Sequence, residues 1–251
     1  MSKKWLLPTA ALLVATMACQ TILDPLTDSS ELEPDILIEP FATEIFEELD
    51  PDTLIEPEAT EPQLGSSGGQ VLLSEDFSDP SSGWEVGDYP SGSVGYTSDA
   101  YFVISLGDSD VMWGLAYQDF DNLQMEFEAT QVRAPANDNN GYGVMCRVQE
   151  NSDGYILRVS GDGYYSIFKV SDGEVVPLVD WETSDAINLG NDTNRFRVIC
   201  DGSLLVLEVN GTQLAATEDT EFSRGDIAFT ATSFEDGPTE VRFDNLTVSA
   251  P

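Results

Sequence analysis

The sequence contains no histidine, which removes the commonest general base and the commonest metal ligand of proteins. Sites that depend on an imidazole, such as Ser-His-Asp triads, Cys-His dyads and histidine zinc sites, are therefore excluded. A metal ion bound here would have to be held by oxygen atoms, which suits calcium. We accordingly expect no cofactor other than, at most, a structural calcium ion.

Basic residues are scarce. Ten Lys and Arg stand against 46 Asp and Glu, which gives a formal net charge of −36. Nucleic-acid binding needs lysine and arginine at the phosphates, so this composition argues against a nucleic-acid partner. The acidic excess favours solubility and repels anionic surfaces at long range.

The N-terminal apolar run is too short for a membrane-spanning helix. It covers residues 5–17, about 13 residues, where a span needs about 20. Lys3 and Lys4 precede it, and Thr16-Met17-Ala18-Cys19 ends it. This order resembles the signal peptide and lipobox of bacterial lipoproteins, although leucine is usual at the first lipobox position.

The resemblance implies that residues 1–19 direct export and that Cys19 is lipidated. The protein would then be anchored at the outer side of the cell membrane and would meet the membrane only through its lipid. An ordinary signal peptide cleaved after Ala18 and an uncleaved anchor are the alternatives.

Residues 20–69 lack basic side chains and carry 14 Asp or Glu and six prolines. Like charges repel one another, and prolines interrupt helices and strands. The glycines and serines of residues 65–69 provide a flexible joint. We predict a disordered acidic, proline-rich linker that holds the following domain, residues 70–251, clear of a lipid surface.

Residues 71–249 lack a helical apolar period and alternate between short strands and Gly, Asn or Asp turns. This pattern is typical of an all-β domain. Asp162-Gly163, Asp201-Gly202 and Asn210-Gly211 suit two-residue hairpin turns, whose positive φ angles these residues tolerate.

Two-residue turns would fix the pairing of the hairpins. The first would pair Leu157 with Phe168 and Val159 with Ser166 on the core face. The residues that alternate with these along each strand would then lie on the other face. The second would pair Val198 with Leu205 on the core face and leave arginines outside. The outward side chains would then include Arg158, Tyr165, Lys169, Arg195 and Arg197.

Several segments resemble one known superfamily in their order along the chain. They are Glu75–Trp84, Gly141–Arg147, Gly154–Ser160, Asn194–Val198, Leu205–Gly211 and Val241–Asn245. Together they resemble the concanavalin A-like lectin/glucanase superfamily, above all bacterial laminin-G-like domains and the family described as 3-keto-disaccharide hydrolase-like. The resemblance implies a concanavalin A-like jelly-roll sandwich of two antiparallel sheets, one of them concave. It implies no particular activity, because this fold hosts lectins, adhesion modules and hydrolases alike.

Glucanases of this superfamily carry an acidic strand motif, whose closest counterpart here is Glu126-Phe127-Glu128. Residues two apart on a strand face the same side, so the two carboxyls could approach the separation used by retaining glycosidases. The central aspartate of the motif is missing, and the run is also typical of a half-exposed strand. We therefore expect no catalytic residue.

The resemblance also implies that the first and last strands pair. That pairing would bring Asp76 and Asp79 near Asp244 and Asn245, whose oxygen atoms are all suitable calcium ligands. Asp76 and Asp244 are the candidate metal residues. Capping of turns and strand ends by these side chains is the alternative.

Two cysteines remain after lipidation of Cys19, and an exported protein meets an oxidising environment. Strand alternation places Cys146 in line with Val144, and Cys200 in line with Val198, so both sulfurs would point into the core. We predict a Cys146–Cys200 disulfide. It would close a loop of 54 residues, which the chain-entropy model values at about 4 kcal/mol. Two buried free thiols are the alternative.

An inward Cys146 would leave the next side chain outward. We therefore predict a basic groove on the concave sheet, formed by Arg147, Arg158, Lys169 and Arg197, with Tyr165 as a ring for sugar stacking. Arginine binds carboxylates through two parallel hydrogen bonds, which suits uronic acids and other anionic glycans. Cross-strand ion pairs, such as Arg195 with Glu208, are the alternative.

The sequence favours a surface-tethered, non-catalytic binding module whose ligand is a carbohydrate, neutral or anionic. A glycoside-acting enzyme of the glucanase or 3-keto-disaccharide hydrolase type is the second hypothesis. An envelope protein-adhesion domain, with another envelope protein as its partner, is the third.

Overall fold

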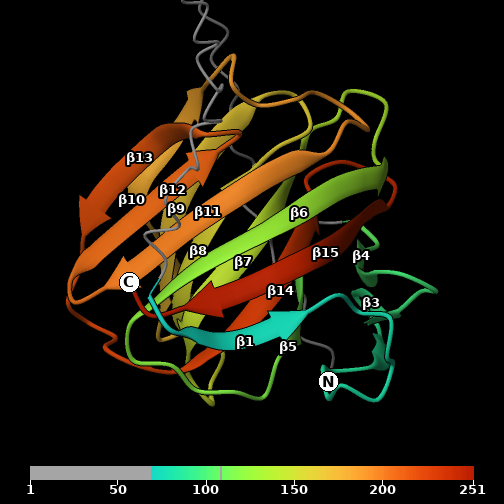
Figure 1. Ribbon diagram of the computed structural model, residues 1–251. Coiled ribbons are helices and arrows are strands. Elements are labelled where there is room, and N and C mark those ends of the chain that lie inside the picture. The colour runs from blue at the N-terminus through green and yellow to red at the C-terminus, as the bar shows by residue number, and fades with distance from the viewer. Residues whose placement is uncertain (1–68, 108) are drawn as a thin grey trace, which may run out of the picture. The chain divides into compact units, whose positions relative to one another are not determined.

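The computed structural model describes residues 69–107 and 109–251 (Figure 1). Fifteen strands and no helix occur within these residues, and the strands form two antiparallel sheets. The predicted all-β sandwich of two antiparallel sheets is confirmed. Nothing in the described part of the chain is a helix long and apolar enough to cross a membrane. The predicted signal peptide, Cys19 and nearly all of the linker lie outside the described residues.

The larger sheet has nine strands and faces the viewer in Figure 1. In spatial order its members are β13 (Thr212–Glu218), β12 (Leu204–Val209), β11 (Asn194–Asp201), β6 (Leu123–Arg133), β15 (Thr239–Ser249), β4 (Tyr101–Ser105), β3 (Gly92–Tyr96) and β2 (Gly87–Tyr89). β1 (Val71–Glu75) also pairs with β15, so the first and last strands are neighbours, as the family resemblance implied.

The smaller sheet has six strands and lies behind the larger one in Figure 1. In spatial order they are β10 (Glu174–Thr183), β9 (Tyr164–Ser171), β8 (Gly154–Val159), β7 (Asn140–Val148), β14 (Asp226–Ser233) and β5 (Val111–Leu115).

The main core fills the space between the two sheets with alternate side chains of both. Phe243 of β15 stacks on Phe229 of β14 with ring centroids 4.2 Å apart. Phe127 of β6 meets Phe229 edge-on at 5.0 Å. Each fully buried ring contributes about 1.5–3 kcal/mol through removal of its apolar surface from water. These aromatic contacts therefore hold one sheet against the other.

A disulfide between Cys146 of β7 and Cys200 of β11 also links the two sheets. Both residues are fully buried in the main core. The predicted disulfide is confirmed, and alternation along each strand correctly gave the inward direction of both sulfurs.

The hairpin between β8 and β9 differs from the predicted one by a single residue. Ser160 pairs with Tyr164, and the loop between them has three residues, with Gly163 at a φ of 93°. Leu157 therefore pairs with Ile167, and Arg158 pairs with Ser166. A shift of one residue moves every side chain of β9 to the other face, so the predicted facing of this strand is wrong.

The next two turns kept the predicted faces. At the second hairpin the loop is Gly202-Ser203, and Val198 pairs with Leu207 instead of Leu205. A shift of two residues leaves the faces unchanged. Asn210-Gly211 forms the expected two-residue turn with φ angles of 51° and 80°, because Val209 pairs with Thr212.

Candidate functional site

The predicted basic groove does not form, because its members lie in different sheets. Arg195 and Arg197 belong to β11 in the nine-stranded sheet, whereas Arg158 belongs to β8 in the six-stranded sheet. On β11, Arg195 Nε lies 2.9 Å from Glu128 Oε1, and Arg197 Nη1 lies 3.0 Å from Glu208 Oε2. The ion-pair alternative therefore holds on this sheet, with a register two residues away from the expected one.

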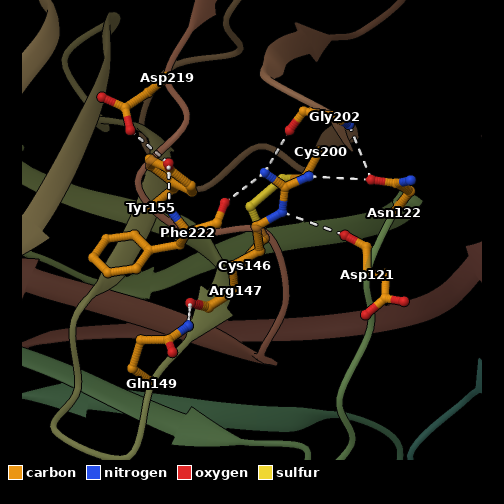
Figure 2. Close-up of a disulfide and its surroundings, with 10 residues drawn as sticks. All are labelled: Asp121, Asn122, Cys146, Arg147, Gln149, Tyr155, Cys200, Gly202, Asp219 and Phe222. Atoms are coloured by element: carbon orange, nitrogen blue, oxygen red, sulfur yellow. Dashed lines mark hydrogen bonds between the residues drawn. A yellow bond between two sulfur atoms is a disulfide. The ribbon is translucent and has the colours of Figure 1, made fainter.

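Arg147 is buried and not part of a surface groove, which corrects its predicted outward position. A bulge where β7 pairs with the start of β14 interrupts the alternation, and Arg147 itself has a φ of 56°. Its guanidinium group donates hydrogen bonds to the carbonyls of Asp121, Gly202 and Phe222 and to Asn122 Oδ1 (Figure 2). These contacts fix the loops that surround the disulfide, so Arg147 has a structural role.

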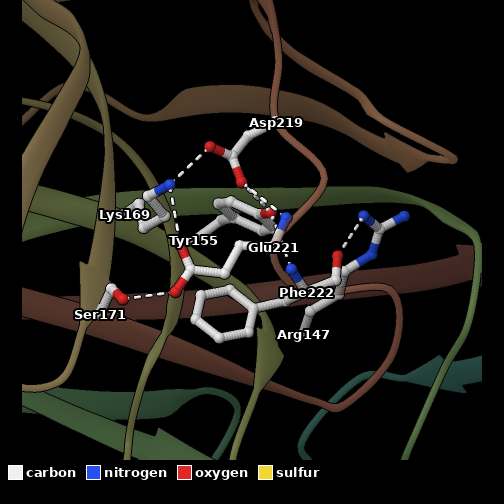
Figure 3. A network of polar contacts seen from close by, with 7 residues as sticks. All are labelled: Arg147, Tyr155, Lys169, Ser171, Asp219, Glu221 and Phe222. Carbon is white, nitrogen blue, oxygen red and sulfur yellow. Dashed lines mark hydrogen bonds and ion pairs between the residues drawn. The ribbon is translucent and has the colours of Figure 1, made fainter.

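Lys169 and Tyr165 also face the other way from their predicted side, because of the three-residue turn. Tyr165 packs in the main core, with its hydroxyl donating to Glu182 Oε2 at 2.9 Å. Lys169 Nζ lies 2.6 Å from Asp219 Oδ2 and 2.8 Å from Glu221 Oε2 (Figure 3). The Lys169 amine is therefore already paired with two carboxylates of the protein.

The acidic pair Glu126 and Glu128 lies on β6, where it pairs with β11. Glu128 is bound by Arg195, and Arg197 Nε lies 3.9 Å from Glu126 Oε1. Each carboxylate is thus part of a cross-strand polar contact of the nine-stranded sheet.

The side chains of the two candidate calcium residues, Asp76 and Asp244, accept hydrogen bonds from the residues that follow them in the chain. Asp76 Oδ1 accepts hydrogen bonds from the backbone nitrogen and hydroxyl of Ser78, which lower the pKa of Asp76. Burial, aided by the neighbouring charges of Glu128, Asp99 and Asp76, raises the pKa of Asp244. Within the described residues no group of three or more Cys, Asp or Glu side chains is arranged to hold a metal ion. Calcium binding therefore stays a prediction.

The side of the six-stranded sheet that points away from the main core is unusual for a two-layer sandwich, because it is apolar. We call this surface the outer face. Its positions alternate with those of the main core on β5, β14, β7, β8 and β9. They are Val111, Trp113, Leu115, Ala228, Thr230, Thr232, Gly141, Gly143, Met145, Ile156, Arg158, Ser166, Phe168 and Val170. Met145, Ile156 and Phe168 form a second apolar cluster there, against which Trp113 and Trp181 pack. Most of these side chains are buried, and Val111, Trp113, Leu115 and Val170 are partly exposed.

A hollow of about 550 Å³ opens beside the outer face, and we call it the rim hollow. Its walls come from the loop before β7, the turn between β8 and β9, strand β10 and the residue after β14. The lining residues are Asn137, Asn139, Asn140, Ser160, Asp162, Tyr164, Trp181 and Phe234. Aromatic rings thus stand beside amide, hydroxyl and carboxylate groups, a combination that suits a ligand with both apolar and hydroxyl surfaces.

Arg158 joins the outer face to the rim hollow. Its guanidinium carbon lies 4.6 Å from the ring centroid of Phe168, 4.8 Å from that of Trp181 and 5.3 Å from that of Phe234. Such cation–π contacts contribute about 0.5–2 kcal/mol, more as water is excluded. Two of these three rings also line the rim hollow, so Arg158 supports its aromatic wall.

Arg158 is the one residue of the predicted basic groove that lies beside the rim hollow, and the sequence did not predict the hollow itself. In the sequence, Asp138-Asn139-Asn140 is typical of a turn, and tryptophans are typical of a sandwich core. Alternation could have placed Trp113 on the outer face, opposite Met112 of the main core. Nothing in the sequence, however, indicated that four separate segments would meet at one hollow.

No family model matches the chain, and no curated protein matches it in sequence. Solved structures match its fold. A carbohydrate-binding module from Bacillus subtilis matches with a TM-score of 0.50 and 16% identity, over 67% of this chain and 96% of that one. A protein of unknown function with a galectin-like fold, also from Bacillus subtilis, matches with a TM-score of 0.56 and 11% identity, over 73% and 97%.

A family 7 alginate lyase in complex with its product matches with a TM-score of 0.51 and 12% identity, over 71% of this chain and all 100% of that one. At these identities the likeness concerns the fold. The described domain is therefore a galectin-like or jelly-roll sandwich, in agreement with the lectin/glucanase-like resemblance of its sequence.

Proposed function

We propose that this protein is a non-catalytic carbohydrate-binding module that holds a glycan at the rim hollow and the adjoining outer face. The observation that carries the proposal is the composition of the hollow, in which Tyr164 and Trp181 stand beside Asn137, Asn139 and Asp162. Apolar faces of sugar rings stack on aromatic side chains, and sugar hydroxyls pair with amides and carboxylates.

The volume and the fold support this proposal. A hollow of about 550 Å³ falls within the range of small-molecule sites, about 300–1,000 Å³. The similar structures include a carbohydrate-binding module and a lyase in complex with its product. The proposed lipid anchor at Cys19 and the acidic linker would present this site outside the cell, away from the membrane.

The small number of carboxylates in the hollow favours glycan binding over glycoside hydrolysis as its function. Glycosidases commonly use two carboxyl groups that flank the scissile bond. Within the described residues, the lining of the hollow includes one carboxylate, that of Asp162, which accepts a hydrogen bond from Ser160. Glu126 and Glu128 belong to the other sheet, where they face cross-strand partners.

A glycan array probed with the full-length chain tests the proposal, and two tyrosines offer a matched pair of variants. Tyr164 lines the hollow and is 41% exposed, whereas Tyr89 on β2 is 40% exposed and belongs to the other sheet. Tyr164→Ala should weaken binding to the array hits by about tenfold, a loss of about 1.4 kcal/mol. Tyr89→Ala should leave it unchanged.

Three results would overturn the proposal. They are the absence of binding to any glycan, equal effects of the two tyrosine variants, and release of shortened products from a bound glycan. Binding of an envelope protein without any response to glycans would instead favour the adhesion hypothesis.

A further inference from the structure

Arg158 carries a buried charge that the described residues leave largely unsatisfied. Its single hydrogen bond to these residues runs from Nη1 to Thr232 Oγ1 at 3.4 Å, and its Nε has no partner among them. No described carboxylate lies within ion-pair distance of Arg158. The other seven basic side chains of the described residues each contact either a carboxylate or several carbonyl oxygens.

A second donor without a partner lies beside this charge. Ser166 is the cross-strand partner of Arg158, so the two side chains share the outer face. The Ser166 hydroxyl is fully buried and has no hydrogen-bond partner among the described residues. A guanidinium N–H and a neighbouring hydroxyl can both donate, which favours a ligand that supplies acceptor oxygens.

The outer face is also free of the acidic side chains that dominate the rest of the chain. Although the sequence holds 46 Asp and Glu, none occupies a position of the outer face, and Arg158 is its one charged residue. Carboxylates begin at its margins, with Asp226 at the start of β14 and Asp162 in the rim hollow. The flanking strand β10 carries Glu174, Asp180 and Glu182. An anionic ligand would therefore meet attraction over the outer face instead of repulsion.

We propose that the glycan bound at this site carries carboxylate groups, as in a chain of uronic acids, and that Arg158 neutralises one of them. This inference rests on the proposed carbohydrate-binding function and names its ligand class. The carboxylate would take the place of the missing counterion. The apolar side chains around Arg158 exclude water and strengthen this ion pair, because charges interact more strongly at low dielectric.

The ionisation state of Arg158 is compatible with this role. Burial lowers its pKa to about 10, so the guanidinium group remains protonated at neutral pH. Trp181 and Phe234 contact both Arg158 and the rim hollow, and they connect the charge to the surface on which the sugar rings would stack.

The test compares acidic glycans with their carboxyl-reduced forms, using full-length protein and calorimetry. Alginate oligosaccharides and oligogalacturonates are the probes, and reduction converts each carboxylate into a neutral hydroxymethyl group. We expect wild-type protein to bind at least one acidic probe about tenfold more tightly than its reduced form.

Arg158→Gln should abolish the preference for the acidic probe over its reduced form, and Arg158→Lys should retain part of it. Arg195→Gln, on the other sheet, is the matched control and should keep the full preference. Equal binding of acidic and reduced probes by wild-type protein would overturn the inference, even if Arg158→Gln failed to fold. Array hits confined to neutral glycans would also overturn it but leave the proposed function intact, whereas no hits would reject both.

Discussion

Two arginines of the described domain lack a carboxylate partner, and they illustrate opposite solutions to burial. Arg147 is 1% exposed and donates to four oxygen atoms of neighbouring loops. Arg158 is 6% exposed and relies mainly on aromatic rings. The sequence could place Arg158 on an outward position by alternation alone. It could not place Arg147, because a bulge with a left-handed residue interrupts the alternation without any glycine at that position to signal it.

Replacement of Arg147 tests its structural role. Arg147→Met keeps much of the side-chain volume but leaves the carbonyls of Gly202 and Phe222 without their charged donor. Hydrogen bonds that involve a charged group contribute about 1.5–3 kcal/mol each, so we expect the free energy of unfolding to fall by about 3 kcal/mol. Urea denaturation followed by tryptophan fluorescence measures this loss.

The control for this variant is Arg195→Met, because Arg195 forms an exposed ion pair whose side chain is 78% accessible. Exposed pairs contribute about 0–1 kcal/mol, so its effect should stay below 1 kcal/mol. Comparable losses in the two variants would argue against a special structural role for Arg147.

The sequence predicted which strands pair, but it predicted the register of that pairing less well. The hairpins from β8 to β9 and from β11 to β12 were both expected, and the disulfide direction was correct. A Gly-Asp-Gly turn, however, accommodates either two or three loop residues. The choice depends on the hydrogen bonds of Ser160 with Tyr164 in the folded structure, which sequence alone does not determine.

One polar cluster connects strands of the two sheets at an edge of the sandwich. Asp219 follows β13 of the larger sheet and contacts Tyr155 of β8 and Lys169 of β9 in the smaller one, at 2.6 Å each. Burial raises the pKa of Asp219, but the hydrogen bonds from Lys169 and Tyr155 outweigh burial and bring it below the ordinary value of 3.8. Burial and the same carboxylate raise the pKa of Tyr155 to about 12.

This depressed pKa predicts a pH-dependent effect of Asp219→Asn. A carboxylate with a lower pKa in the folded state stabilises the protein above the unfolded-state pKa, near 3.8, and loses that contribution as pH falls through the folded value. Lys169 has a raised pKa and stays charged throughout this range. The destabilisation caused by Asp219→Asn should therefore be largest at pH 7 and shrink steadily below about pH 4.

Urea unfolding of both proteins at several pH values between about 7 and 3 measures this difference. Asp88→Asn, at an exposed position of β2, serves as the control and should show little effect at any pH. A constant difference between wild type and Asp219→Asn across the range would contradict the assignment.

Over the whole chain, the fold could be predicted from the sequence more fully than the proposed binding surface. The order of short motifs gave the fold class, whereas the acidic linker inferred from composition stays a prediction. The proposed binding surface could be predicted only in part. The sequence placed Arg158 on an outward position, but its aromatic neighbours Phe168, Trp181 and Phe234 come from three other segments that only the sheet order brings together.

The proposed anchor gives a prediction for the intact protein in its cell. Cys19→Ala should release the protein from membranes without unfolding the domain, because two or three acyl chains supply the anchoring energy, at about 0.8 kcal/mol per buried CH₂. Membrane fractionation with immunoblotting measures the distribution, and mass spectrometry of the mature N-terminus checks lipidation. A variant that stays membrane-bound, or a mature protein that retains Met1, would refute lipidation at Cys19.

The three-residue turn between β8 and β9 also bears on how such a surface could evolve. Because strand side chains alternate, the loss of one codon within residues 161–163 would exchange the two faces of β9. Phe168 and Ser166 would turn inward, and Tyr165, Ile167 and Lys169 would take their places on the outer face. A change of turn length would thus replace an entire row of outer-face side chains in a single genetic event, whereas point substitutions would have to alter the same row one residue at a time.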